Sequence, residues 1–183
     1  MAKVYEFLAT GFEEIEMITT VDLLRRADIE VCLVSITGER EVAGAHGITV
    51  VADELYEEVK TFAGDMLLLP GGQPGTTNLG NYKPLLRLLK EWSAKHQKIA
   101  AICAAPGILG ELGLLKGHQA TSYPSVMQKL IGADKSEEEV VVDEHIITSR
   151  GVGSAIAFGL RLVSILKGDT CAQELAKSIL YKM

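Results

Sequence analysis

Short apolar segments alternate along this chain with longer segments whose apolar residues recur every three or four positions. The first pattern is typical of strands buried on both faces, and the second is typical of helices with one buried face. The expected strands are 3–8, 30–36, 48–51, 66–69, 99–102, 119–121, 140–142 and 146–148, and the expected helices are 13–27, 54–59 (capped by Asp53), 84–95, 106–112, 154–166 and 170–180.

This alternation predicts the fold class. Strands and helices that alternate along a chain form a mostly parallel sheet covered by helices on both faces. The chain contains no internal repeat, low-complexity tract or dividing linker. We therefore expect a single α/β domain over residues 1–183, with ligands bound beyond the carboxyl ends of its strands.

Composition and charge narrow the function classes. The chain has 183 residues, a net charge of −6 and scattered basic residues, so we expect no nucleic-acid binding. The longest apolar runs are too short to cross a membrane, and the first residues form a strand-like run without a secretion signal. Three cysteines far apart in the sequence favour reduced thiols over disulfides. These features predict a cytoplasmic protein.

The strongest candidate for chemistry is Cys103, which lies between an expected strand and an expected helix. A side chain at such a sharp turn is pushed outward, and the residues two positions before and after it must be small. Ala101 and Ala105 occupy those positions. The start of the following helix favours a thiolate. We therefore interpret Cys103 as a nucleophile, against the alternative of a small buried hydrophobic residue.

The other two cysteines are weaker candidates. Cys32 lies within an apolar strand, which indicates core packing. Cys171 lies near the start of the last helix, but Asp169 and Glu174 oppose a second negative charge there.

Two glycine-containing segments follow expected strands. Gly71 and Gly72 allow backbone amides to approach a ligand closely. The amides of Gly72 and Ala104 could then form an oxyanion hole for Cys103, and a plain turn is the alternative. Segment 151–156 begins like a dinucleotide-binding motif, but its third position is isoleucine, so we expect no cofactor.

The acid–base residues are harder to choose. Glu13, Glu14 and Glu16 begin the first expected helix, where carboxylates usually serve the helix dipole. Helical spacing puts Glu14 nearer the apolar side, so periodicity does not decide which carboxylate reaches the thiol. The histidines show no metal-ligand spacing and none adjoins the cysteine, so we expect no metal site. They are His46, His96, His118 and His145.

Five segments, in order and spread over almost the whole chain, together resemble one protein family. They are Gly11–Glu16, Val21–Ala27, Leu69–Gly72, Ala100–Pro106 and Thr148–Gly151. The family is ThiJ/PfpI, in particular the branch of the parkinsonism-associated protein deglycase and its bacterial relatives.

The resemblance implies a flavodoxin-like sandwich of the class I glutamine amidotransferase-like type and a homodimer that packs near the first helix. It implies a reactive cysteine at Cys103, with Glu16 as the carboxylate beside the sulfur. It places the oxyanion amides at Gly72 and Ala104. The candidate pocket residues are Gly71, Tyr123, His46 and Arg150.

Some positions depart from the family. Ala104 stands where peptidase-like members carry a histidine, and Tyr123 stands where some deglycase relatives carry one. A phenol is a poor base at neutral pH, so proton transfer falls mainly to Glu16. Val152 replaces a proline, at the cost of a little rigidity.

These residues predict a cofactor-free enzyme that uses Cys103 to attack 2-oxoaldehydes or their early glycation adducts, as a glyoxalase or deglycase does. One alternative is a stress sensor or chaperone in which Cys103 is oxidised. A cysteine peptidase or amidase is a third hypothesis, which lacks a histidine partner for the thiol.

Overall fold

The computed structural model describes residues 2–182, and its centre is a seven-stranded sheet. The strand order is β10-β11-β7-β6-β1-β2-β5, in which only the edge strand β10 is antiparallel to its neighbour. The strands are β1 (Lys3–Leu8), β2 (Glu30–Ser35), β3 (Glu41–Ala43), β4 (Thr49–Val51), β5 (Glu54–Leu55), β6 (Met66–Leu69), β7 (Lys98–Ile102), β8 (Gln119–Ala120), β9 (Asp134–Lys135), β10 (Val140–Asp143) and β11 (Ile146–Ser149).

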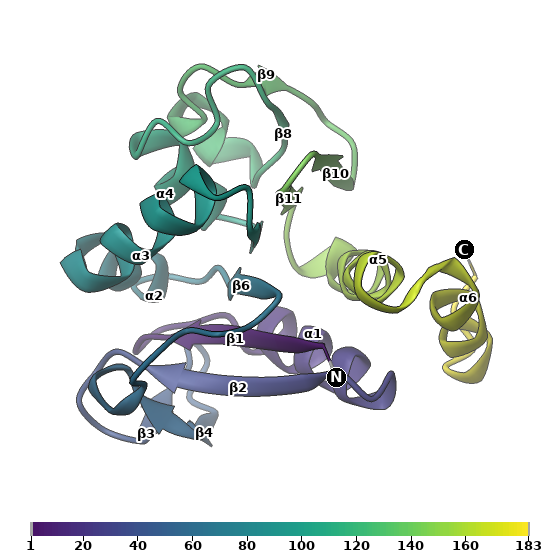
Figure 1. Ribbon diagram of the computed structural model, residues 1–183, viewed down its shortest axis with the longest axis horizontal. Coiled ribbons are helices and arrows are strands. Elements are labelled where there is room, and N and C mark those ends of the chain that lie inside the picture. The colour runs from purple at the N-terminus through teal and green to yellow at the C-terminus, as the bar shows by residue number, and fades with distance from the viewer. Residues whose placement is uncertain (1, 183) are drawn as a thin grey trace.

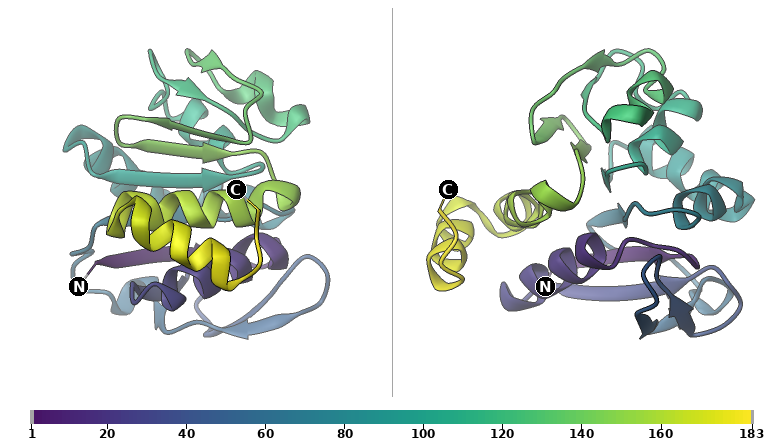
Figure 2. Two further views of the ribbon diagram at one scale, coloured as in Figure 1. Left: turned by 90° about the vertical axis from the view of Figure 1, so that its right-hand side faces the viewer. Right: turned by 180° about the vertical axis from the view of Figure 1, so that it is seen from behind.

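Helices cover both faces of this sheet (Figures 1 and 2). One face carries α1, α5 and α6, and the other carries α2, α3 and α4. The expected flavodoxin-like α/β fold is confirmed. The helices are α1 (Glu14–Arg26), α2 (Gly75–Asn81), α3 (Lys83–Ala94), α4 (Pro106–Glu111), α5 (Ala155–Lys167) and α6 (Asp169–Ser178), with 3₁₀ turns at Tyr56–Glu58, Pro124–Lys129 and Val152–Ser154.

The apolar pattern of the sequence explains these layers. Strand β6 is fully buried, as its uninterrupted apolar run requires. Helix α3 buries Leu85, Leu88, Leu89 and Trp92, which recur at helical spacing along one side. None of the helices within residues 2–182 is long and apolar enough to span a membrane.

The parallel pairing positions the candidate site. Strands β11, β7, β6 and β1 are neighbours and run in the same direction, so their carboxyl ends meet at one edge of the sheet. Cys103 directly follows β7, and Gly71 lies two residues after β6. Gly151 follows β11 in the same way, and Glu16 lies in the first turn of α1, after β1. Four separate segments therefore converge, as expected for this fold class.

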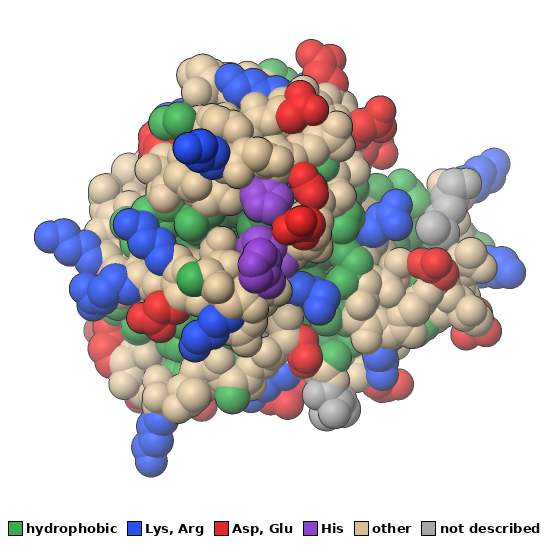
Figure 3. Space-filling view, turned by 45° about the horizontal axis from the view of Figure 1, so that its top comes forward, with side chains coloured by type: hydrophobic (Ala, Val, Ile, Leu, Met, Phe, Trp, Pro, Cys, Tyr) green, Lys and Arg blue, Asp and Glu red, His purple; other side chains and the backbone are tan. Residues whose placement is uncertain are grey.

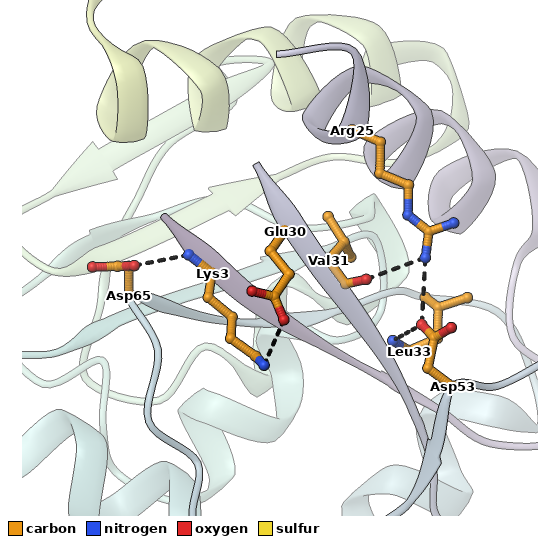
Figure 4. A network of polar contacts seen from close by, with 7 residues as sticks. All are labelled: Lys3, Arg25, Glu30, Val31, Leu33, Asp53 and Asp65. Carbon is orange, nitrogen blue, oxygen red and sulfur yellow. Dashed lines mark hydrogen bonds and ion pairs between the residues drawn. The ribbon is translucent and has the colours of Figure 1, made fainter. Parts of the chain in front are cut away.

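The expected helix over 54–59 is wrong. Residues 54–55 pair with β2, and only one 3₁₀ turn follows them. Asp53 does not cap a helix, because its Oδ2 accepts hydrogen bonds from the Leu33 amide at 2.8 Å and the Arg25 guanidinium at 3.3 Å (Figure 4). This carboxylate thereby fastens the edge of the sheet to α1.

Two small pairings and one helix were not predicted. Strand β3 pairs with β4 in a hairpin outside the main sheet, and β8 pairs with β9. Strand β8 coincides with the expected strand 119–121, but it does not join the main sheet. Helix α2 has a sequence rich in Gly, Thr and Asn, which lacks an apolar stripe.

Candidate active site

Cys103 lies on a strained turn between β7 and α4. Its φ angle is +63°, a left-handed conformation that side chains other than glycine rarely adopt. The Cys103 amide donates to the carbonyl oxygen of Ser149 at 2.9 Å, which fastens the turn to the end of β11. Ala101 and Ala105 are fully buried beneath it. The strand–turn–helix geometry is the one that exposes a nucleophile.

Backbone groups surround the sulfur. The backbone amides of Gly72 and Ala104 act on the Cys103 thiol, and both lower its pKa. Gly71 has no room for a side chain, because a Cβ there would lie 2.6 Å from the Cys103 Cβ and 3.1 Å from its Sγ. The glycines after β6 thus allow the main chain to approach the sulfur directly.

Glu16 lies beside Cys103 and is fully buried. Its Oε2 accepts a hydrogen bond from the Gly71 amide at 2.9 Å. Its Oε1 is also buried and has no oxygen or nitrogen partner among residues 2–182. A Cβ on Gly151 would lie 3.7 Å from the Cys103 Sγ and 3.8 Å from this Oε1, so these three groups meet in one place.

Glu14 is equally buried but serves another purpose. Its Oε1 accepts from the His46 amide at 2.6 Å, and its Oε2 lies 2.8 Å from the His46 Nδ1. These bonds lower the pKa of the Glu14 carboxyl despite the opposing effect of burial, and they raise that of His46. Glu14 therefore fastens the β3–β4 hairpin to α1, while Glu16 turns toward the thiol.

The Glu16 carboxyl and the Cys103 thiol influence each other's protonation. Burial raises the pKa of Glu16 to about 7, although hydrogen bonds to Cys103 and Gly71 oppose this shift. Burial and the Glu16 charge raise the pKa of Cys103 to about 12, although the Ala104 and Gly72 amides oppose it. Two groups this close titrate as a pair. Near neutral pH the carboxyl therefore gains and loses a proton readily.

The raised pKa of Cys103 corrects an expectation. The start of α4 was expected to favour the thiolate, but α4 has only six residues and the sulfur is largely desolvated. Burial and the carboxylate outweigh the two amides. A thiolate is favoured here only when Glu16 carries the proton, because its negative charge is then absent.

The other candidate pocket residues divide into two groups. Tyr123 lies near the site, because a Cβ on Gly151 would lie 3.5 Å from its ring. Its amide also donates to the Cys103 carbonyl oxygen at 2.8 Å. Arg150 instead donates to the carbonyl oxygen of Glu137 at 2.8 Å. His46 is bonded to Glu14, as described above.

A small hollow adjoins the oxyanion amides. It has a volume of about 230 Å³ and lies between α2, α4 and the 3₁₀ turn at Pro124–Lys129. Ala104 and Gln73 line its inner side, and Val126 and Lys129 line the opposite wall. The space accommodates a small molecule or a side chain next to Ala104, the residue that follows Cys103.

Comparison with known proteins identifies the family. A model of the DJ-1/PfpI family matches residues 2–165. The chain belongs to the DJ-1/PfpI family. The oxidized DJ-1 of Toxoplasma gondii has a similar structure, with a TM-score of 0.96, 36% sequence identity and complete coverage of both chains.

The chain spans different shares of the length of two DJ-1/PfpI relatives. Protein DJ-1 homolog B of Arabidopsis thaliana is 39% identical over 171 residues, which are 92% of this chain and 39% of that protein. The chain thus spans less than half of this relative's length. A protein of Pyrococcus abyssi named a deglycase is 34% identical over 161 residues, which are 87% of this chain and 96% of that protein.

The histidines of this DJ-1/PfpI chain lie away from the thiol. His46 pairs with Glu14, and the His145 ring contacts those of His96 and His118 at the opposite edge of the sheet. Two groups of side chains have the spacing of metal ligands: Glu13, Glu14 and His46, and His96, Glu144 and His145. We expected no metal site because no histidines or cysteines have metal-ligand spacing along the sequence. Such spacing does not reveal ligands that only folding brings together.

Two further residues of the site had weak signals in the sequence. The sequence indicated only tight packing for Gly151. In the structure, Gly151 lies close to the Cys103 sulfur. Its φ of +156° supports a wide turn between β11 and α5. Ser154 also contributes, since its hydroxyl bonds the Gly151 amide at 3.1 Å and Ser149 at 2.7 Å. A serine three residues after a strand-end glycine is the signal that could have indicated this turn.

Proposed function

We propose that this chain is a cofactor-free enzyme that converts 2-oxoaldehydes, or their early adducts on amines and thiols, to 2-hydroxy acids. One observation carries the proposal. The backbone amides of Gly72 and Ala104 act on the Cys103 sulfur, which lies against the buried Glu16 carboxyl. The pKa of this carboxyl is raised to about 7. A nucleophile, oxyanion donors and a proton carrier matched to neutral pH are what this reaction requires.

The reaction begins at the aldehyde carbon. Glu16 takes the proton of the Cys103 thiol as the sulfur adds to the aldehyde of methylglyoxal. The carbonyl oxygen becomes an oxyanion held by the Gly72 and Ala104 amides, and Glu16 then protonates it to give a hemithioacetal.

The second stage moves a proton between adjacent carbons. The Glu16 carboxylate removes the proton from the former aldehyde carbon and returns it to the neighbouring carbon, while the hydroxyl proton passes from the first oxygen to the second, which leaves a thioester on Cys103. Water hydrolyses this thioester, so methylglyoxal and water together give lactic acid and the free thiol. The name of the Pyrococcus abyssi relative, a deglycase, supports this type of substrate.

The direct test is lactate production from methylglyoxal without glutathione by the wild type, Cys103→Ser and Glu16→Gln. We expect activity in the wild type and loss in both variants. Undiminished turnover in Cys103→Ser would refute the proposal. A wild type that makes no lactate, although its thiol is alkylated normally, would also count against it.

A second candidate function is redox sensing. The thiol is partly exposed and lies beside a carboxyl that can hold an oxidised sulfur by a hydrogen bond, and the similar Toxoplasma gondii protein is described as oxidized. Mass spectrometry after mild peroxide treatment separates the two functions. An adduct of about 32 mass units on Cys103, two oxygens, together with no aldehyde turnover favours the sensor. Peptide hydrolysis has less support, because no histidine adjoins the thiol within residues 2–182.

We also propose that the chain forms a homodimer through α1 and the β3–β4 hairpin. Ile15 and Ile18 are exposed on α1, and Ile48 and Val51 are exposed on the hairpin beside it. An apolar patch of this kind is typical of an interface between copies. Ile18→Glu should halve the mass measured in solution by light scattering, whereas Ile131→Glu, on an exposed isoleucine elsewhere, should not. A monomeric wild type excludes the dimer.

A further inference from the structure

Three histidines gather at the amino edge of the sheet, at the opposite ends of the strands from Cys103. His96 precedes β7, His118 precedes β8 and His145 precedes β11. The His145 ring meets the His96 ring edge-on at 4.9 Å and the His118 ring at 5.4 Å. On the molecular surface, histidines lie together with acidic side chains around a hollow (Figure 3). This group plays no part in the proposed chemistry of Cys103.

Two of these histidines, His96 and His145, lie close to Glu144, and the three side chains each turn one possible ligand atom toward the others. The Glu144 Oε2 lies 4.0 Å from the His96 Nδ1 and 4.0 Å from the His145 Nδ1. All three atoms lie within 4.8 Å of one another. Ligands of a tetrahedral Zn²⁺ lie about 3.3 Å apart, which follows from metal–ligand distances of about 2.0 Å. Small rotations of the exposed His96 and Glu144 side chains close this difference.

His145 supplies independent evidence for a ligand. It is 6% exposed, and its buried Nδ1 has no hydrogen-bond partner within residues 2–182. Its other ring nitrogen, Nε2, lies 3.2 Å from the Ser93 hydroxyl. When Nε2–H donates to Ser93, the Nδ1 presents a lone pair to the hollow. A ligating histidine is typically oriented in this way, by a hydrogen bond from its second nitrogen.

The backbone aims the two exposed ligands. His96 follows the end of α3 in a left-handed conformation, with a φ of +53°. Its amide donates to Ser93 and the Gln97 amide donates to Trp92, the pattern that closes a helix end. Glu144 has a φ of +51° in the tight turn between β10 and β11. Both turns direct their side chains over His145.

We propose that His96, Glu144 and His145 bind one Zn²⁺ ion, with the fourth position open to water. Two imidazoles and one carboxylate are a ligand set that Zn²⁺ accepts. The ion strengthens the link between the end of α3 and the β10–β11 hairpin, which the Ser93–His145 hydrogen bond and the His96–His145 ring contact already join.

The second acidic group does not offer an equivalent site. In the group of Glu13, Glu14 and His46, both oxygens of Glu14 already accept hydrogen bonds from the β3–β4 hairpin. No unpartnered buried atom of the described residues points into it. His46 therefore serves as the control histidine.

Calorimetric titration of the full chain with zinc chloride tests the proposal. All variants carry Cys103→Ser, which removes the thiol, so that zinc cannot bind to the pair of Cys103 and Glu16. We expect one Zn²⁺ per chain, with binding at least about tenfold weaker in His96→Asn and in Glu144→Gln. His96→Asn keeps a residue that tolerates the left-handed turn, so the fold is maintained. His46→Gln should leave the affinity within about twofold.

Two further measurements sharpen the test. Lys98 lines the same hollow and its ammonium opposes a cation, so Lys98→Met should tighten binding. Zinc should also raise the melting temperature of the parent chain but not that of His96→Asn, because only a ligand bound to the folded chain stabilises it. Binding that is absent from the parent, that survives both ligand substitutions, or that disappears in His46→Gln would overturn the proposal.

Discussion

The two edges of the sheet place reactive side chains in opposite surroundings. At the carboxyl edge, Cys103 and Glu16 lie among glycines whose amides contact them directly. At the amino edge, His96 and Glu144 stand in open turns with most of their side chains exposed, and only His145 is buried. Both edges hold a residue other than glycine in the left-handed conformation.

The two edges differ in how freely the side chains around each site can move. At the carboxyl edge, backbone atoms pack tightly around the buried Glu16 and the partly exposed Cys103, so a small change there alters the proton equilibrium of the pair. The amino edge has two free side chains around one fixed imidazole, so it can rearrange around an ion. The first arrangement suits a reaction with fixed geometry, and the second suits a ligand that completes the site.

The largest effect is expected from Glu16→Gln. Its amide keeps the shape of the carboxyl but carries no proton between carbons, so turnover of methylglyoxal should fall by about 10²–10⁴-fold. Alkylation of Cys103 by iodoacetamide should persist, because the glutamine carries no negative charge to oppose the thiolate. Stopped-flow alkylation and lactate assays on the same preparation measure both. Parallel loss of alkylation and turnover would mean that the variant fails at activation of the sulfur, before the proton transfer between carbons.

The second effect is on the pH dependence of stability. The Glu16 carboxyl has a pKa of about 7 in the folded chain and an ordinary value of 4.5. Because the folded chain holds this proton to higher pH than the unfolded chain, stability falls as pH rises from 4.5 to 7 and remains lower above. The shift corresponds to about 3 kcal/mol.

Urea unfolding at pH 5 and pH 8 measures this difference. The wild type should lose about 3 kcal/mol more over the interval than Glu16→Gln, which cannot titrate there. Glu6 beside Thr20 titrates in both proteins, and the Glu16 charge raises its pKa further in the wild type only, so Glu6 adds to the same difference. Equal losses in the two proteins would show that Glu16 does not hold a proton at neutral pH.

A third, smaller effect is expected from Gly71→Ala. The added Cβ meets the Cys103 Cβ and the Glu16 Oε2 at 2.6 Å, and overpacking of this kind costs about 1–3 kcal/mol. Gly153→Ala is the matched control, because no atom lies within 4 Å of its Cβ position. Thermal unfolding and lactate assays should show losses in the first variant only. A Gly71→Ala protein that matches the Gly153→Ala protein in both assays would mean that the carboxyl edge is less tightly packed.

Apolar runs predicted the main sheet, because strands buried on both faces, such as β6, have an unbroken apolar sequence. The β3–β4 hairpin was not predicted in full, since it lies outside the sheet and its first strand has only three residues, two of them exposed. Asp53 resembled a helix cap but bonds Leu33 and Arg25, and these partners come from elsewhere in the chain. Local patterns do not report on such partners.

The sequence predicts those parts of the candidate site that depend only on neighbouring residues in the chain. The turn at Cys103 needs small neighbours, and the sequence displays them. The choice between Glu14 and Glu16 is not local, because both are buried and only the hairpin contact of Glu14 separates them. The histidines of the amino edge come from three distant turns, so only the parallel sheet brings them together.

The smallest effect is expected from His96→Gly in the metal-free chain. His96 occupies the position after α3 at which helices usually carry glycine, because a side chain is strained at its φ of +53°. Removing this strain should stabilise the metal-free chain by up to about 1 kcal/mol. The same substitution removes a proposed zinc ligand, so the order of stability should reverse when zinc is added. Urea unfolding of the wild type and His96→Gly, with zinc and with a chelator, measures both differences. A wild type that is more stable than His96→Gly without zinc would show that this edge is built for packing alone.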